Sequence, residues 1–208
     1  MRYLLFISWI CYCCSCAFPY PYLHKVQADP SCIEKFKPQF ASTWYNIDVQ
    51  IQSRHLSGLL VIKQMPDSST RIVCTTQTGI SLFDFGFLSK NEFKVYHIID
   101  QMNRKFLIRV LQEDFDLILF RHKPGLKLYV YGDSTNHYFA FPANSGIDFY
   151  ITDPTCAILN RIERSYNSNI IVVAHMTGSP GEIPELISIA HRDFRMNIEL
   201  KKMEHVDR

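Results

Sequence analysis

The stretch from Leu56 to Phe87, LSGLLVIK-QMPDSS-TRIVCTT-QTG-ISLFDFGF, decides the fold. Its three apolar runs are rich in Val, Ile, Thr and Phe, which suit a pleated, half-buried strand. The Pro-Asp-Ser-Ser segment at 66–69 and the Gln-Thr-Gly segment at 77–79 supply turn residues between the runs. Connections this short join antiparallel neighbours, because a parallel pair needs a crossover of about a dozen residues. The stretch therefore predicts a three-stranded β-meander.

The third strand of this meander carries a row of phenylalanines on one face. Side chains alternate along a strand, so Phe83, Phe85 and Phe87 point to the same side, whereas Leu82 and Asp84 point to the other. We call these three phenylalanines the Phe row. An aromatic face of this size must be covered by apolar groups, and the nature of that cover bears directly on function.

Strand patterns continue on both sides of the meander. We expect ten or eleven strands in total, in one globular domain, because 208 residues with 47% hydrophobic and 20% charged residues fit a single folded unit. Alternating or β-rich runs outside the meander lie at 40–52, 92–99, 126–132, 136–141, 148–152, 157–165, 169–175, 185–191 and 194–203.

Between two groups of strands the apolar residues recur with the period of a helix. Met102, Phe106 and Val110 lie four residues apart, and Asp100 is a candidate N-cap. The pattern predicts an amphipathic helix of about four turns, from Asp100 to about Asp114, followed by a short helical continuation over 115–120. Because no other segment is as strongly amphipathic, this helix is the expected cover of the Phe row.

The N-terminus resembles a secretory leader. A short basic region is followed by an apolar run of about ten residues, about half of what a bilayer span requires. The run ends in Cys13-Cys14-Ser15-Cys16, which is similar to a bacterial lipoprotein signal, where cleavage precedes an acylated cysteine. We expect a signal peptide over 1–15 and lipidation of Cys16, with acyl chains that anchor the protein to a membrane. The alternatives are an ordinary secretory signal and a buried N-terminal helix.

Residues 16–38 are interpreted as the lipidated cysteine and a tether, and residues 39–208 as the folded domain. Alternating prolines at 18–22 favour an extended, polyproline-like tether. Beyond the leader only Cys32, Cys74 and Cys156 remain, and their spacing gives neither a zinc site nor a disulfide framework. An oxidising compartment would allow a disulfide between Cys32 and Cys156, but we predict that this disulfide does not form. Cys74 should pack as a small hydrophobic residue.

The sequence contains no motif of a catalytic or metal site. It has no G-x-S-x-G or H-E-x-x-H motif, and its eight histidines are dispersed. His191 and Asp193 lie in a predicted hairpin turn, and Glu113, Asp114 and Asp116 cluster at the predicted helix end; we interpret both groups as solvated surface. A formal charge of +2 gives no polyanion-binding footprint. We therefore expect no enzyme activity, no cofactor and no nucleic-acid partner.

The order of these features resembles the family of the lipoprotein carrier LolA and its membrane-anchored acceptor LolB. The resemblance covers about residues 40–203 and rests on LSGLLVIK at 56–63, the strand at 80–85 and the closing PELISIAHRDFRMNIELKKME at 184–204. It implies a mostly β fold with inserted helices (α+β), an incomplete and strongly curved antiparallel β-barrel with a helical lid. The acceptor's membrane-active loop and the carrier's lid-locking arginine have no counterpart in this sequence.

The resemblance implies a cell-envelope lipoprotein of Gram-negative type, anchored by lipid to the periplasmic face of the outer membrane. As a monomer it would bind the acyl chains of lipids or lipoproteins in an apolar barrel cavity. The alternatives are a structural envelope lipoprotein whose packed barrel docks a protein partner, and a lipocalin-like carrier of a small apolar molecule. The expected cavity lining is Trp44, Leu60, Ile62, Val73, Phe83, Phe85, Met102, Phe106 and Val110.

Overall fold

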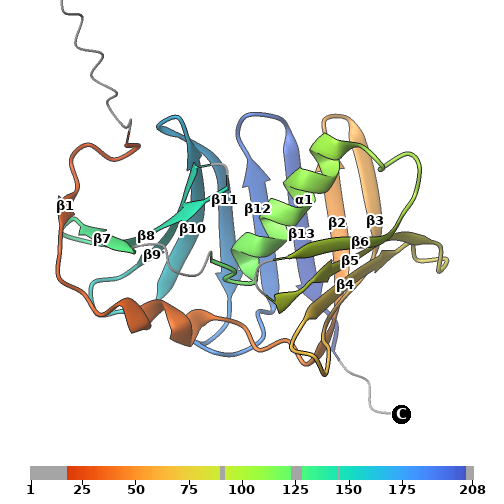
Figure 1. Ribbon diagram of the computed structural model, residues 1–208, viewed down its shortest axis with the longest axis horizontal. Helices are drawn as coiled ribbons and strands as arrows, with labels where there is room; N and C mark the ends of the chain where they lie inside the picture. Colours follow the sequence, from red (N-terminus) through yellow and green to blue (C-terminus); the bar gives the residue numbers. More distant parts are fainter. Residues whose placement is uncertain (1–17, 90–91, 123–127, 145, 205–208) are drawn as a thin grey trace, which may run out of the picture.

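The computed structural model describes residues 18–89, 92–122, 128–144 and 146–204. These residues form one antiparallel sheet of thirteen strands in the order β1-β7-β8-β9-β10-β11-β12-β13-β2-β3-β4-β5-β6. The sheet curves strongly, and its two edge strands, β1 and β6, do not meet (Figure 1). The protein is thus an open, curved antiparallel barrel. No helix in the described ranges is long and apolar enough to cross a membrane.

The sequence pattern located twelve of these strands, but it missed β1, which has only two residues and therefore shows no periodicity. In chain order the elements are β1 (His24–Lys25), the 3₁₀ helix η1 (Pro30–Phe36), β2 (Ser42–Ile51), β3 (Arg54–Gln64), β4 (Thr70–Thr75), β5 (Ser81–Phe87), β6 (Phe93–Ile98), α1 (Lys105–Ile118), β7 (Tyr129–Gly132), β8 (His137–Ala143), β9 (Gly146–Thr152), β10 (Leu159–Tyr166), β11 (Asn169–Thr177), β12 (Leu186–His191) and β13 (Met196–Lys202). The predicted total of ten or eleven strands is therefore too low.

The predicted meander is confirmed as β3, β4 and β5, which pair in sequence order. Leu60 lies opposite Cys74, and Cys74 lies opposite Phe83, so that all three side chains share the inner face of the curved sheet. The whole Phe row is buried on this face, with exposed fractions of 2% or less.

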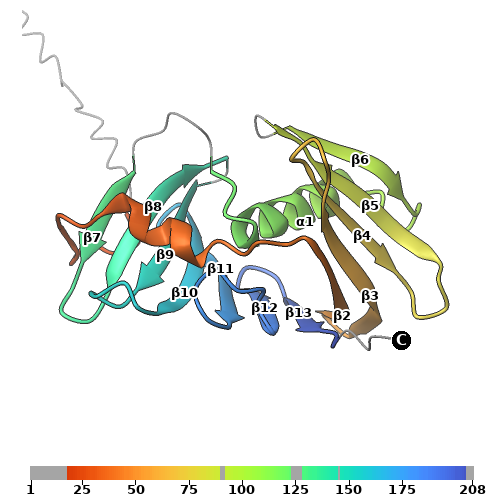
Figure 2. The same cartoon turned by 90° about the horizontal axis from the view of Figure 1, so that it is seen from below.

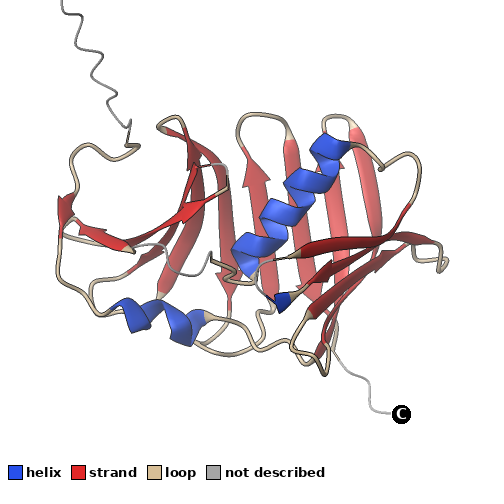
Figure 3. Cartoon of the chain, in the orientation of Figure 1, coloured by secondary structure: helices blue, strands red, loops and turns tan. Residues whose placement is uncertain are grey.

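The helix α1 lies across the concave side of the sheet, between the strands β7–β9 and the strands β3–β6 (Figures 2 and 3). The ring of Phe115 lies 6.1 Å from the rings of both Phe83 and Phe87, measured between centroids, so the predicted cover of the Phe row is confirmed. The predicted helix start is wrong: Asn103 closes a turn onto the carbonyls of Ile99 and Asp100, and the helix begins at Lys105. It then runs unbroken to Ile118, without a separate second helix.

Residues 18–38 are packed against the domain, so the interpretation of this segment as an extended tether is wrong. Phe18 and Tyr20 make ring contacts with Phe149 of β9, and the hydroxyl of Tyr20 hydrogen bonds to Glu163. β1 adds a strand beside β7, and the side chain of Ile33 in η1 is fully buried. Phe18 and Tyr20, on either side of Pro19, bury apolar area against β9, which an extended tether would leave in water. The predicted leader and Cys16 lie outside the described residues.

Cys32 and Cys156 form a disulfide, which corrects the prediction of unpaired thiols. The helix η1 brings Cys32 to the turn between β9 and β10, where the two Cα atoms are 6.1 Å apart, a separation suited to a disulfide. The two residues are 124 positions apart in sequence, so only the fold reveals their proximity. Cys74 is free and buried, and this burial raises its pKa to about 12, as fits a small core residue.

Candidate functional site

A groove opens between α1 and the strands β10 to β12. Its volume is about 400 Å³, within the range typical of ligand sites. The exposed side chains of Phe106 and Tyr166 belong to its lining and lie at its rim, with 57% and 52% of their surface in solvent. We call this feature the α1 groove; it is lined by Phe106, Arg109, Val110, Glu113, Asp114, Asn144, Arg164, Tyr166, Ile171, Val172, His191, Asp193 and Phe194.

The structure brings only part of the predicted cavity lining to this groove. Val110 and Phe106 line it, although Phe106 lies at the rim and packs its ring on Phe194. Met102 is half-buried, where it packs against the edge of the core. The core itself contains the other inward-facing predictions, Leu60, Ile62, Phe83 and Phe85, which are all buried. Within the described residues, α1 and the sheet fill this part of the interior with side chains.

Trp44 and Val73 lie on the outer face of the sheet rather than inside the barrel. Trp44 is opposite Val61, and Val61 is opposite Val73, so the three side chains form one cross-strand row. Tyr45 takes the inward position next to Trp44 and is fully buried. The predicted facing of both residues is therefore off by one, and a shift of one residue moves a strand side chain to the opposite face.

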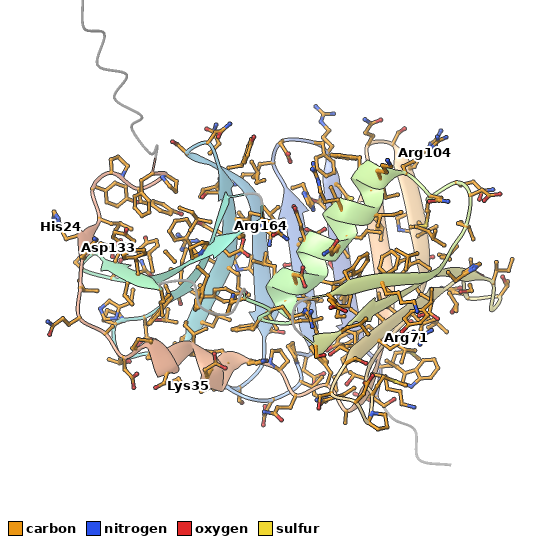
Figure 4. The ribbon with its side chains drawn as sticks, viewed as in Figure 1. His24, Lys35, Arg71, Arg104, Asp133 and Arg164 are labelled. Carbon is orange, nitrogen blue, oxygen red and sulfur yellow. A yellow bond between two sulfur atoms is a disulfide. The ribbon has the colours of Figure 1, made fainter. Side chains whose placement is uncertain are left out.

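The inner wall of the α1 groove is ionic. Arg164, labelled beside α1 in Figure 4, has a side chain only 3% exposed and binds Asp148 through two hydrogen bonds of 2.6 and 2.9 Å. Its Nη1 atom also lies 3.5 Å from a carboxylate oxygen of Glu113. Nε2 of His191 is 2.9 Å from Oδ2 of Asp114, and both side chains are almost fully buried. Three of these five residues come from the strands β9, β10 and β12 and two from α1, and together they tie the helix to the sheet.

Burial sets the electrostatics of this cluster. It raises the pKa of Asp114 and of Asp148, and the neighbouring His191 and Arg164 oppose that effect. For Arg164 burial disfavours the charged form, but Asp148 and Glu113 outweigh it and raise the pKa of the guanidinium. Two buried atoms, Oδ1 of Asp114 and Nη1 of Arg164, make no hydrogen bond among the described residues. These two atoms retain hydrogen-bonding capacity inside the protein.

The interpretation of Glu113, Asp114, Asp116 and His191 as solvated surface is therefore wrong. Glu113 and Asp114 lie where α1 meets the sheet, and their basic partners come from distant strands, 77 positions away for His191. Asp116 pairs with Arg121, five positions along the chain, and its side chain is 21% exposed. One signal was present in the sequence. Ile162 and Arg164 are two residues apart in a strand, so an arginine had to share the inner face with a core isoleucine.

A second titratable group, His122, lies just beyond the C-terminal end of α1. Its ring stacks on Phe141 at 3.7 Å between centroids, and burial lowers its pKa to about 4. Asp116 lies nearby on α1 and pairs with Arg121, but burial raises the pKa of its carboxyl to about 6. Within the described residues no group of three His, Cys, Asp or Glu side chains is placed to hold a metal ion.

The buried His122 should make stability depend on pH. The unfolded chain protonates this histidine below its ordinary pKa of 6.5, whereas the folded protein resists protonation down to about 4. The free energy of unfolding contributed by His122 should therefore fall as the pH decreases through this window, by about 2–3 kcal/mol between pH 7 and pH 4.5. His122→Phe, which keeps a ring against Phe141, should remove this contribution.

The measurement is the difference between wild type and His122→Phe in urea unfolding at the two pH values. The difference is needed because Asp116 acts in the opposite sense: its raised pKa makes stability decrease as the pH rises from about 4 to about 6. A difference that stays constant between pH 4.5 and pH 7 would show that His122 titrates normally in the folded protein.

Comparison with known proteins identifies the class of fold. No protein-family model and no curated protein matches the chain. The structure is similar to the crystal structure of a LolA superfamily protein from Nitrosomonas europaea, with a TM-score of 0.55 and 7% sequence identity over 86% of this chain and 93% of that chain. The described chain thus has a LolA/LolB-like fold, as the sequence pattern predicted.

Two further structures have lower scores. One is an outer membrane lipoprotein-sorting protein domain from Vibrio parahaemolyticus, with a TM-score of 0.47 and 6% identity over 84% of this chain and 88% of that chain. The other is a DUF1329 family protein from Desulfovibrio piger, with a TM-score of 0.43 and 6% identity over 83% of this chain and 87% of that chain. Similarity at this level of identity describes the fold only.

Proposed function

We propose that the protein binds lipid acyl chains between α1 and the sheet, as a non-catalytic carrier or acceptor of lipids or lipoproteins. The α1 groove is the observation that carries the proposal. Its volume of about 400 Å³ is sufficient for a ligand, and its rim exposes the aromatic rings of Phe106 and Tyr166. Burial of an acyl chain there would be driven by apolar area, at about 25 cal/mol per Å².

In this proposal the helix α1 acts as a lid that opens at its N-terminal half. The C-terminal half is fixed by Phe115 in the core and by the hydroxyl of Tyr150, which donates to the carbonyl of Leu117 at 2.8 Å. The N-terminal half has the exposed Phe106 and no side-chain N-cap at Arg104. Outward movement of the N-terminal half would widen the groove without breaking any hydrogen bond between neighbouring strands.

The membrane anchor is part of the proposal. A lipidated Cys16 would be separated by Ala17 alone from Phe18, which packs on β9. The domain would then sit directly at the membrane surface rather than at the end of a tether. By resemblance to bacterial lipoproteins, we propose the periplasmic face of the outer membrane as its location.

The second candidate function is a structural lipoprotein that docks a protein partner. The observation that favours it is the packing beneath α1, where the buried ring of Phe83 stacks on Phe85 and contacts Phe115. Lipid binding separates the two candidates, because a structural lipoprotein of this kind would retain no acyl chain.

The test is lipid retention by the purified, delipidated protein, measured by native mass spectrometry and by titration with a fluorescent palmitoyl probe. We expect Phe106→Asp to weaken binding about tenfold, because it places a charge where the chain enters. Ile80→Asp is the matched control: Ile80 is 62% exposed in the β4–β5 turn, outside the groove lining, so binding should not change. A wild-type protein that retains no probe, or two variants with equal affinity, would refute the proposal.

A further inference from the structure

We infer that the α1 groove selects amphiphiles with a small, uncharged head that bears a hydroxyl group, bound with the head inward. The inference rests on the proposed function, because it concerns the inner wall of the same groove. It narrows the ligand from acyl chains in general to free neutral lipids of the monoacylglycerol type.

The orientation follows from how burial is distributed in the groove. Phe106 and Tyr166 are exposed at the rim, together with the polar residues Arg109, Asn144 and Asp193, whereas Asp114 and Arg164 are 1% and 3% exposed. The deep end therefore contains a buried carboxylate and a buried guanidinium beside apolar side chains, and the rim contains two aromatic rings among polar groups. An apolar chain end would desolvate the buried ionic wall without replacing its hydrogen bonds, whereas a polar head can pair with it. The chain would leave past the rim.

The hydrogen-bonding requirement follows from two buried atoms that make no hydrogen bond, one of which, Nη1 of Arg164, lies 3.5 Å from a carboxylate oxygen of Glu113. In the ion pair with His191, Asp114 uses Oδ2, and in the pair with Asp148, Arg164 uses Nε and Nη2. Oδ1 of Asp114 and Nη1 of Arg164 remain without a hydrogen bond among the described residues. A hydroxyl group can donate to a carboxylate oxygen and accept from a guanidinium N–H. Both atoms are enclosed, so the head reaches them when the part of α1 that precedes Phe115, which includes Asp114, moves outward.

The charge of the head follows from the charges that line the groove. Glu113, Asp114 and Asp193 contribute carboxylates, whereas Arg109 and Arg164 contribute guanidiniums and His191 an imidazole. Arg164 is already neutralised by its two hydrogen bonds to Asp148. An anionic head would therefore meet carboxylates, and a cationic head would meet Arg109. A neutral head avoids both repulsions.

The first experiment measures binding of four probes with the same sixteen-carbon chain to the full protein, each below its micelle concentration. The probes are monopalmitoylglycerol, palmitate, hexadecyltrimethylammonium and a palmitoylated peptide. We expect monopalmitoylglycerol to bind at least tenfold more tightly than the other three. If none of the four binds, the proposed function fails as well. If the four bind within threefold of one another, or if a charged probe or the peptide binds tightest, acyl-chain binding stands and the inference is overturned.

The second experiment uses Asp114→Asn, which removes one carboxylate from the inner wall and keeps the shape of the side chain. We expect palmitate to bind this variant more tightly than it binds the wild type, so that the preference for monopalmitoylglycerol falls at least threefold. A misfolded variant would lose both ligands, so a gain for palmitate cannot come from damage to the fold. An unchanged preference in a variant that still binds monopalmitoylglycerol would remove Asp114 from the head site and overturn the inference.

Discussion

Arg164→Met should lower the free energy of unfolding by about 3–5 kcal/mol, because it leaves buried carboxylates without their cation. The guanidinium of Arg164 makes two hydrogen bonds to Asp148 and lies 3.5 Å from Glu113, and its side chain is 3% exposed. Met has a similar length and retains the apolar contacts of the stem. The measurement is urea unfolding at pH 7, followed by intrinsic fluorescence.

The chain provides a matched control for this prediction on the outer face of the sheet. Arg71 binds Asp84 with the same two-pronged geometry, with Nη2 2.7 Å from Oδ2, but its side chain is 30% exposed. Arg71→Met should therefore cost about 1 kcal/mol, including the contact of its guanidinium with the ring of Tyr96. The double variant with Asp148→Asn and Arg164→Met should recover part of the free energy of unfolding that Arg164→Met loses. If the two arginine variants lose the same free energy of unfolding, burial does not make the loss of the Arg164–Asp148 pair more destabilising than the loss of an exposed pair.

Phe115→Ala should also lower the free energy of unfolding by about 3–5 kcal/mol. This residue is 1% exposed, and its ring contacts Phe83 and Phe87, so its removal opens a cavity between α1 and the Phe row. The neighbouring rings belong to a sheet held on both sides by hydrogen-bonded strands, so they cannot collapse into the space. Urea unfolding of the variant provides the measurement.

Phe106→Ala, on the same helix, is the control for Phe115→Ala. The ring of Phe106 is 57% exposed and contacts Phe194 only at the groove rim, so its loss should cost below about 1 kcal/mol. The two variants together compare the two halves of α1. Similar losses at both positions would mean that the helix is anchored along its whole length, and the lid would then have no free half.

The arrangement of strands was largely predictable because burial leaves a period of two in the sequence. The alternation in 40–52 and the Phe row both located inward faces, and the single amphipathic segment identified the helix that covers them. The N-terminal part of the domain was not predictable in the same way. The strand β1 is too short for a pattern, and the packing of Phe18 and Tyr20 depends on partners such as Phe149, more than 120 positions away.

The candidate site was harder to predict than the fold. Charged residues are usually exposed, so the acidic end of α1 gave the ordinary pattern of a solvated face. Only the partners Arg164 and His191 reverse that interpretation, and they are contributed by strands distant in sequence. The facing error at Val73 had a different cause: its strand has apolar residues on both faces and does not reveal which side is inside. Trp44 shares its face with Asn46 and Asp48, so the alternation in 40–52 already assigned it to the outer face, and its inclusion in the lining went against that pattern.

The pairing of β2 with β13 has a consequence for the order in which the protein forms during synthesis. These strands are neighbours near the middle of the sheet, yet β2 is made early and β13 is the last of the described strands to be made. Until then β2 presents an unpaired edge in the growing chain, a site prone to wrong association. The disulfide cannot form before Cys156 emerges, which is also after β2. Quality control of this protein should therefore depend on protecting one strand until β13 has been made.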